Sequence, residues 1–288
     1  MGFIYWQSKQ LKGKLMPDES QETKTREKEM PFLEHLEELR WRLIKSAIAV
    51  IVGMVICLFF SQKILDLLIL PTHYLDTPLV LQVLKVQGMF IVKLEVGFFG
   101  GLVLALPFVL VQFWRFISPG LIETEQHYFV PLIASSTLLF LIGLSFAYFI
   151  ILPLAINFFI GLASGDIKPN IAIDFYIGFV LRILLVFGFV FELPMVSYFL
   201  SKIGLLTPAF MRKYRRHAIV VIFVVAAVLT PPDVITQILL GVPLIFLYEF
   251  SILIAKTVER NKKRKEQQTD QQSAKEETDP GTGKGENS

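Results

Sequence analysis

The side chains that could do chemistry in this sequence are a few carboxylates set in apolar or basic surroundings. Glu38 precedes an apolar segment and stands four residues before Arg42, while Glu123 and Glu125 follow the aromatic segment around Trp114. Carboxylates beside aromatic faces suit guanidinium groups, which they meet through forked hydrogen bonds and stacking. The pattern therefore indicates binding of an arginine-type cation, although an ordinary intrahelical pair of Glu38 with Arg42 is the simpler alternative at that position.

Two further polar residues stand within apolar segments. Glu192 is followed by Pro194, and an ionisable group at such a position is a functional candidate unless it forms a structural pair. Arg182 lies ten residues earlier, ~15 Å along a helix, and is not an obvious partner. Gln237 stands near the start of the last apolar segment, where a hydrogen bond between helices is commoner than a ligand contact.

Catalytic constellations are not apparent. The four histidines fall in expected loops or at the ends of apolar segments, and there is one cysteine, Cys57. The sequence has no His-Glu-x-x-His helix and no glycine-rich phosphate loop. We therefore expect no catalytic residues, no metal site and no cofactor.

The elements that position these side chains are set by hydropathy. Of the 288 residues, 53% are apolar and only 18% are charged, against roughly a quarter in soluble domains. The stretch 126–165 contains no Asp, Glu, Lys or Arg, and a membrane span needs only about 20 such residues. These patterns exclude an ordinary soluble enzyme, and the net charge of +3 is too small to indicate a nucleic-acid partner.

Hydropathy predicts an all-α integral membrane protein with six transmembrane helices, at about 43–60, 89–113, 128–160, 175–200, 217–229 and 234–255. We expect bends in the third at Pro131 and Pro153. The fifth is short, because Ala218–Leu229 extends only ~18 Å as a helix against ~30 Å of hydrocarbon. A re-entrant segment is the alternative there. A short span is favoured, because the sixth must begin on the far side to end at the basic tail.

Lysine and arginine predict the orientation. They gather before the first span, after the fourth and after the sixth, whereas the opposite side has only Lys63, Lys85 and Lys168. Both termini are therefore expected to be cytoplasmic. The polar segments 1–30 and 257–288 are expected to be disordered cytoplasmic tails, which flank a six-span membrane domain over 31–256.

Six strings of residues resemble those of the TatC family, the multi-span receptor subunit of the twin-arginine protein translocase. They are His35-Leu-Glu-Glu-Leu-Arg40, Pro107-Phe-Val-Leu-Val-Gln112-Phe-Trp114, Phe116-Ile-Ser-Pro119-Gly-Leu, Phe146-Ala-Tyr-Phe149, Phe191-Glu-Leu-Pro194 and Leu229-Thr-Pro-Pro-Asp233-Val-Ile-Thr-Gln237. Each string is modestly specific, but their order and spacing over six predicted spans are highly specific.

The resemblance implies a receptor that binds twin-arginine signal peptides of folded cargo and exports them with the protonmotive force. It places the receptor carboxylates at Glu38 and Glu125, with Phe116, Pro119 and Arg40 beside them. It also implies short fifth and sixth helices and a concave groove. In that groove, single-span TatA- and TatB-type subunits would pack near Glu192, while Gln237 matches a polar position near the outer end of the last span.

Further implications concern assembly and location. The resemblance implies a homo-oligomeric complex in the lipid bilayer of the cell inner membrane, with a thylakoid membrane the less favoured location. The alternative function is a proton-coupled secondary transporter or channel that uses Glu192. That class often shows internal repeats and a polar midplane cavity, and no repeat is visible between the two halves of this sequence.

Overall fold

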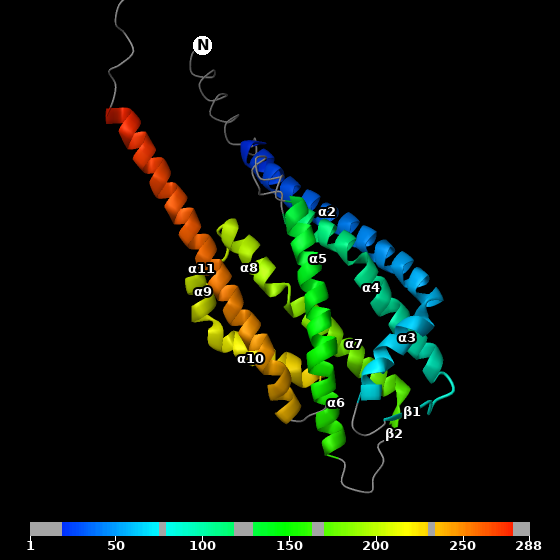
Figure 1. Cartoon of the computed structure of the whole chain (residues 1–288). Helices are drawn as coiled ribbons and strands as arrows, with labels where there is room; N and C mark the ends of the chain where they lie inside the picture. The colour runs from blue at the N-terminus through cyan, green and yellow to red at the C-terminus, as the bar shows by residue number, and fades with distance from the viewer. Residues whose placement is uncertain (1–18, 75–78, 118–128, 163–169, 230–233, 279–288) are drawn as a thin grey trace, which may run out of the picture.

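The computed structural model describes residues 19–74, 79–117, 129–162, 170–229 and 234–278 (Figure 1). These residues are almost entirely helical. The α-helices are α2 (Glu19–Phe59), α3 (Ser61–Ile69), α4 (Gly88–Ile117), α5 (Phe129–Phe146), α6 (Leu152–Gly161), α7 (Ile173–Val190), α8 (Leu193–Lys202), α9 (Pro208–Lys213), α10 (Arg215–Leu229) and α11 (Val234–Thr278). The other elements are a 3-10 turn η1 (Leu70–Tyr74), a π-helical segment η4 (Ala147–Ile151) and the strands β1 (Val80–Gln82) and β2 (Asn170–Ala172).

Several of these helices are long and apolar enough to cross a membrane. Among the described residues there are 5 such candidates, at His35–Phe59, Gly88–Phe116, Val130–Gly161, Ile173–Lys202 and Val234–Arg264. The chain is therefore a multi-pass, all-α membrane protein. The expected fifth span is α10, whose 15 residues extend only about 22 Å.

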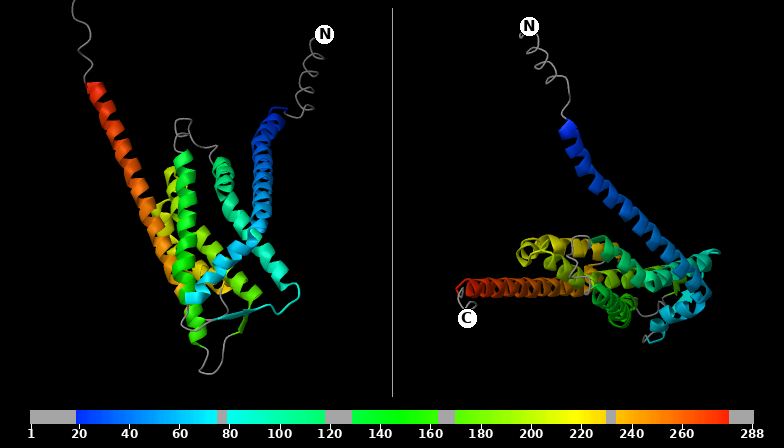
Figure 2. Two further views of the ribbon diagram at one scale, coloured as in Figure 1. Left: turned by 45° about the vertical axis from the view of Figure 1, so that its right-hand side comes forward. Right: turned by 90° about the horizontal axis from the view of Figure 1, so that it is seen from above.

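The two ends of the molecule differ in character. The first turns of α2 and the last turns of α11 project from one end, whereas β1 and β2 lie at the other (Figures 1 and 2). The two strands pair in parallel, with Val80 opposite Asn170. At the same end, Lys85 Nζ lies 3.0 Å from Asp174 Oδ2 and reinforces the strand pairing.

Two of the expected spans are irregular just before a proline, because proline lacks the backbone N–H that a helix interior requires. The third continues through η4 into α6, where Pro153 lies in the first turn. The expected bend at Pro131 is wrong, because this residue lies in the first turn of α5, where a missing N–H costs nothing. The fourth divides into α7 and α8 at Phe191 and Glu192, immediately before Pro194.

The polar tails contain more helix than the sequence analysis predicted. α2 begins at Glu19, and α11 continues as one helix to Thr278, so the sixth helix is not short. Lys, Arg, Glu and Gln are good helix formers, and Glu259 pairs with Lys263 one turn later at 2.8 Å. Helix can therefore continue there without burial. The division at residues 30 and 257 stays a prediction.

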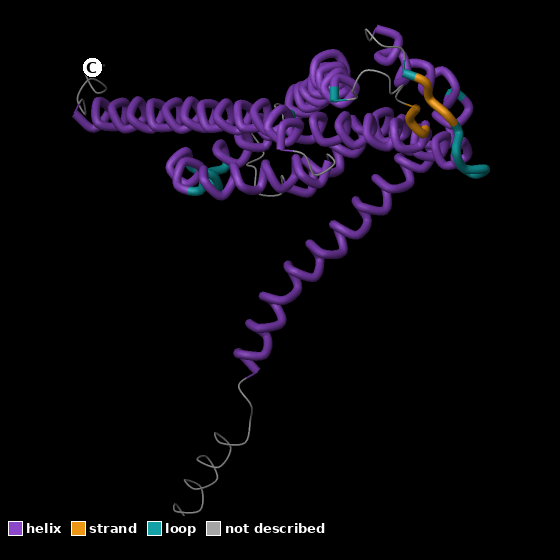
Figure 3. Tube along the Cα trace, turned by 90° about the horizontal axis from the view of Figure 1, so that it is seen from below, coloured by secondary structure: helices purple, strands orange, loops and turns teal. Residues whose placement is uncertain are grey.

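Glycines bring α2 and α4 into close contact. A Cβ atom added at Gly101 would lie 2.3 Å from the Met54 backbone nitrogen, and one at Gly53 would lie 2.7 Å from the Gly101 carbonyl oxygen. Small residues allow such approach between membrane helices. Toward its N-terminus α2 diverges from the other helices (Figure 3). The close contact at Gly53 and Gly101 therefore sets the relative position of α2 and α4 at the end that carries Glu38.

The core lies mainly around α7, which packs against α4, α5, α3, α10 and α11. Its fully buried side chains are Ile177, Val180, Ile183 and Phe187. Tyr176 Oη donates a hydrogen bond of 3.1 Å to the Leu68 carbonyl, and Tyr148 Oη donates one of 2.6 Å to the Leu67 carbonyl. These bonds tie α7 and η4 to α3.

Candidate functional site

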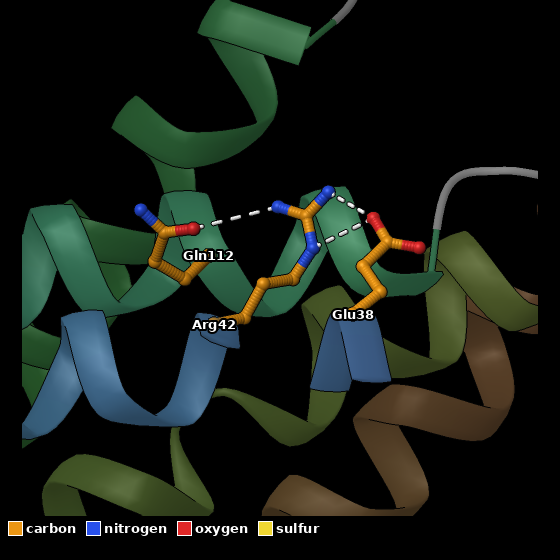
Figure 4. Close-up of polar contacts among 3 residues, drawn as sticks. All are labelled: Glu38, Arg42 and Gln112. Atoms are coloured by element: carbon orange, nitrogen blue, oxygen red, sulfur yellow. Dashed lines mark hydrogen bonds and ion pairs between the residues drawn. The ribbon is translucent and has the colours of Figure 1, made fainter. Parts of the chain in front are cut away.

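A polar cluster joins α2 to α4 near the end from which the termini project. Arg42 Nε donates a 2.9 Å hydrogen bond to Glu38 Oε1, and its Nη2 donates a second, shorter one to the same oxygen. Arg42 Nη1 lies 3.4 Å from Gln112 Oε1 on α4 (Figure 4). The intrahelical pair that the sequence allowed at Glu38 is therefore formed, and a third residue extends it across the helix crossing.

The members of this cluster differ in their access to solvent. The side chain of Glu38 is 38% exposed and that of Arg42 is 20% exposed, whereas Gln112 is buried. Both contacts from Arg42 use Oε1, and the described residues supply no hydrogen-bond partner to Oε2 of Glu38. The carboxylate is therefore held in place while one of its oxygens stays available to a cationic ligand.

An aromatic contact extends the corner between α2 and α4. The rings of His35 and Phe116 stack with centroids 4.4 Å apart and an interplanar angle of 12°. Phe116 is the last residue but one of α4, and Arg40 is exposed on α2. His35 lies one turn before Glu38 on α2, so the stacked rings form an aromatic face near that carboxylate. The sequence did not indicate that His35 would stack on Phe116.

Trp114 anchors the end of α4 in a buried contact with other helices. Its side chain is buried and packs edge to face on Phe199, with centroids 4.6 Å apart, in a small core that also includes Leu132. In the sequence, Trp114 stands out only as part of an aromatic segment. The structure uses it to join α4 to α5 and α8, which fixes the position of Phe116 two residues later.

The remaining residues expected at this site lie outside the described part of the chain. Glu125 and Pro119, together with Glu123, belong to 118–128. The described chain stops at the end of α4 and resumes at Phe129. The approach of Glu125 to Glu38 thus stays a prediction.

Glu192 occupies the break between α7 and α8 and is buried. Ser136 on α5 is a polar neighbour of its carboxyl group, and neither side chain has a hydrogen-bond partner within the described residues. Arg182 is exposed on α7 and is not paired with it. Buried polar groups are normally hydrogen-bonded, so this carboxyl group is a candidate to bind a polar group of another molecule.

Gln237 has a structural contact. Its Nε2 donates a 2.9 Å hydrogen bond to the Phe223 carbonyl, which joins α11 to α10. Within the described residues, no hydrogen bond or ion pair joins Gln237 or Glu192 to the corner that holds Glu38.

One ion pair was not anticipated. Arg215 Nε lies 2.5 Å from Glu249 Oε1, and Tyr248 Oη donates a 2.9 Å hydrogen bond to the Met211 carbonyl. The shortness of α10 and the Pro-Pro pair in the sequence between α10 and α11 are the signal that could have paired these helix ends. Within the described residues, no three His, Cys, Asp or Glu side chains gather as metal ligands would.

Comparison with known proteins gives one consistent result. Residues 34–243 match the model of the TatC family, described as Sec-independent protein translocase protein. A TatC protein of Desulforapulum autotrophicum is 40% identical over 84% of this chain and 90% of its own length. One of Aquifex aeolicus is 41% identical over 81% of this chain and 98% of its own. A crystal structure of the twin-arginine translocase receptor TatC matches with a TM-score of 0.74 and 40% identity, covering 78% of this chain and 99% of that one.

Proposed function

Because the chain belongs to the TatC family of Sec-independent protein translocase proteins, we propose that it is the receptor and core subunit of a twin-arginine translocase. The observation that carries the proposal is its likeness to the solved twin-arginine translocase receptor over most of both chains. In this proposal the protein recognises cargo and serves as a scaffold within a protein translocase, and it does not catalyse a reaction. The alternative of a proton-coupled transporter or channel using Glu192 is not favoured by these likenesses.

The signal-peptide site is proposed to lie where α2 and α4 meet. Glu38 would accept one arginine of the twin pair and Glu125 the other, while Phe116, Pro119 and Arg40 would surround them. What supports this is a half-exposed, oriented carboxylate at Glu38 beside the aromatic face of Phe116 and His35. Both features suit a guanidinium group, which binds carboxylates through a fork and stacks on aromatic rings.

The proposed topology has six spans, with both termini in the cytoplasm and the protein in the inner membrane. It counts α10 as the fifth span, which thins the local bilayer or is shielded by its neighbours. The projection of α2 and α11 from one end supports it, as does the lysine and arginine distribution. A concave groove remains part of this proposal.

A direct test of the receptor function compares two peptides. A signal peptide with paired arginines is expected to crosslink to the full-length protein in membrane vesicles, and the same peptide with paired lysines is expected to crosslink much more weakly. Lysine has the charge but lacks the planar fork that a carboxylate binds at two points. Equal crosslinking of the two peptides would contradict recognition of arginine.

We also propose that single-span partner subunits pack in a groove near Glu192, in a homo-oligomeric complex. Gln237, which joins the last two helices, is the second polar residue assigned to that groove. Support comes from the buried Glu192 carboxyl group without a hydrogen-bond partner in the described residues. A polar group on a partner helix would satisfy it.

Glu192→Ala is accordingly expected to reduce crosslinking to single-span subunits and to abolish export, while the twin-arginine peptide still binds. The change removes the buried group that the partner would contact and leaves the α2–α4 corner intact. Glu95→Ala is the matched control, because Glu95 is an exposed carboxylate within the span of α4. Normal partner crosslinking in Glu192→Ala would contradict the assignment, and in that case a loss of export would point to proton coupling.

A further inference from the structure

The Glu38 carboxylate already has a guanidinium bound to it. Arg42 lies one turn further along α2, and both its Nε and its Nη2 donate to the same oxygen, Oε1. Arg42 is not the ligand of this site, because it belongs to the same helix as Glu38. A second arginine that binds Glu38 must therefore do so in the presence of the Arg42 guanidinium.

We propose that Arg42 is a built-in competitor for Glu38, and that Gln112 is the second acceptor to which its guanidinium turns when a signal-peptide arginine binds. The inference rests on the proposed function and adds a control step to the same site. Arg42 holds one oxygen of Glu38 and neutralises its charge. An arginine peptide would therefore have to compete with Arg42 for this carboxylate, which disfavours weak cationic ligands.

The contacts of Arg42 support an exchange between two acceptors. Its Nε lies 2.9 Å from Glu38 Oε1, within the usual 2.7–3.2 Å for such a bond, whereas Nη1 lies 3.4 Å from Gln112 Oε1, beyond that range. The long contact can shorten if the guanidinium moves toward α4. Gln112 is buried on α4 and next to the Trp114 anchor in sequence, so it is a fixed acceptor (Figure 4).

Charge gives the direction of the effect. Two guanidinium groups on one carboxylate repel each other, and Arg42 cancels much of the negative potential that would attract a cationic peptide. Gln112 is neutral, so it offers Arg42 a hydrogen bond without adding attraction for the peptide. Removing Arg42 should therefore strengthen binding, whereas a residue that merely supports the fold would weaken it.

The test measures the affinity of a synthetic twin-arginine signal peptide for the full-length protein in lipid nanodiscs. Arg42→Gln is expected to bind about two- to fivefold more tightly, the size of effect of a partly exposed ion pair. Arg42→Lys keeps the charge and should bind like the unaltered protein. The gain should shrink at high salt. Equal or weaker binding by Arg42→Gln would overturn the proposal.

Gln112→Leu provides a second, independent measurement. Without the alternative acceptor, Arg42 should stay on Glu38, so binding should weaken about two- to fivefold. The same substitution combined with Arg42→Gln should have no further effect, because the group that uses Gln112 has gone. An undiminished effect in the combined variant would show that Gln112 acts through the fold and would overturn its assigned role.

Glu38→Gln separates this inference from the receptor assignment. If Glu38→Gln binds the peptide normally, Glu38 is not the receptor carboxylate, and a competitor for it has no meaning. If Glu38→Gln loses binding but Arg42→Gln shows no gain, the receptor assignment stands and only the competition is wrong.

Discussion

Replacing Glu38 and Glu125 together by alanine is expected to abolish crosslinking of a twin-arginine peptide, while the protein still inserts into the membrane. Removing one partner of a charge-assisted contact in a partly desolvated site costs roughly 2–5 kcal/mol. Even the lower figure corresponds to a loss of roughly 30-fold in affinity. The measurement is photocrosslinking in membrane vesicles at matched protein levels.

Glu37→Ala is the matched control for that variant. Glu37 is also on α2 but is exposed, and it has no ion pair among the described residues. It should retain peptide binding. Normal crosslinking in the double variant, or an equal loss in Glu37→Ala, would show that the pair of carboxylates is not the docking point.

The second large effect is expected at the crossing of α2 and α4. Gly101→Ala places a Cβ atom 2.3 Å from the Met54 nitrogen and 2.6 Å from its Cα atom. These are backbone atoms, so α2 has to move away as a whole. Overpacking of this kind costs about 1–3 kcal/mol of folding free energy. We expect a lower thermal midpoint in detergent and weaker peptide binding, because α2 and α4 carry opposite sides of the site.

Gly161→Ala gives the comparison, since a Cβ atom there has no heavy atom within 4 Å. It should leave both the thermal midpoint and peptide binding unchanged. If Gly101→Ala behaves like Gly161→Ala, the close crossing does not hold the site together.

Some of the site follows from local rules and was therefore predictable. Glu38 and Arg42 pair because residues four apart share one face of a helix. Glu192 lies at a break in the fourth span because Pro194 cannot continue the hydrogen bonds of the preceding turn. Both features depend on neighbours within a few residues.

The contact between Arg42 and Gln112 could not be predicted in this way, because the two residues are 70 positions apart. The same holds for the burial of Trp114 against Phe199 and for the bond from Gln237 to the Phe223 carbonyl. The continuation of α11 to Thr278 was missed for a different reason. Composition showed that this segment has little to bury, but a helix of charged residues does not need burial to form.

By itself, the sequence determined the membrane class, the approximate positions of the apolar helices and the candidate carboxylates. Hydropathy and helical spacing are local properties that a single chain displays directly. Only the tertiary structure decided which helix faces meet. Membrane helices such as α5 are apolar on all sides, and lipid is as apolar as their neighbours, so periodicity does not mark the packed face. Close contact at Gly53 and Gly101 makes that choice, and with it brings Gln112 to Arg42 and Glu38.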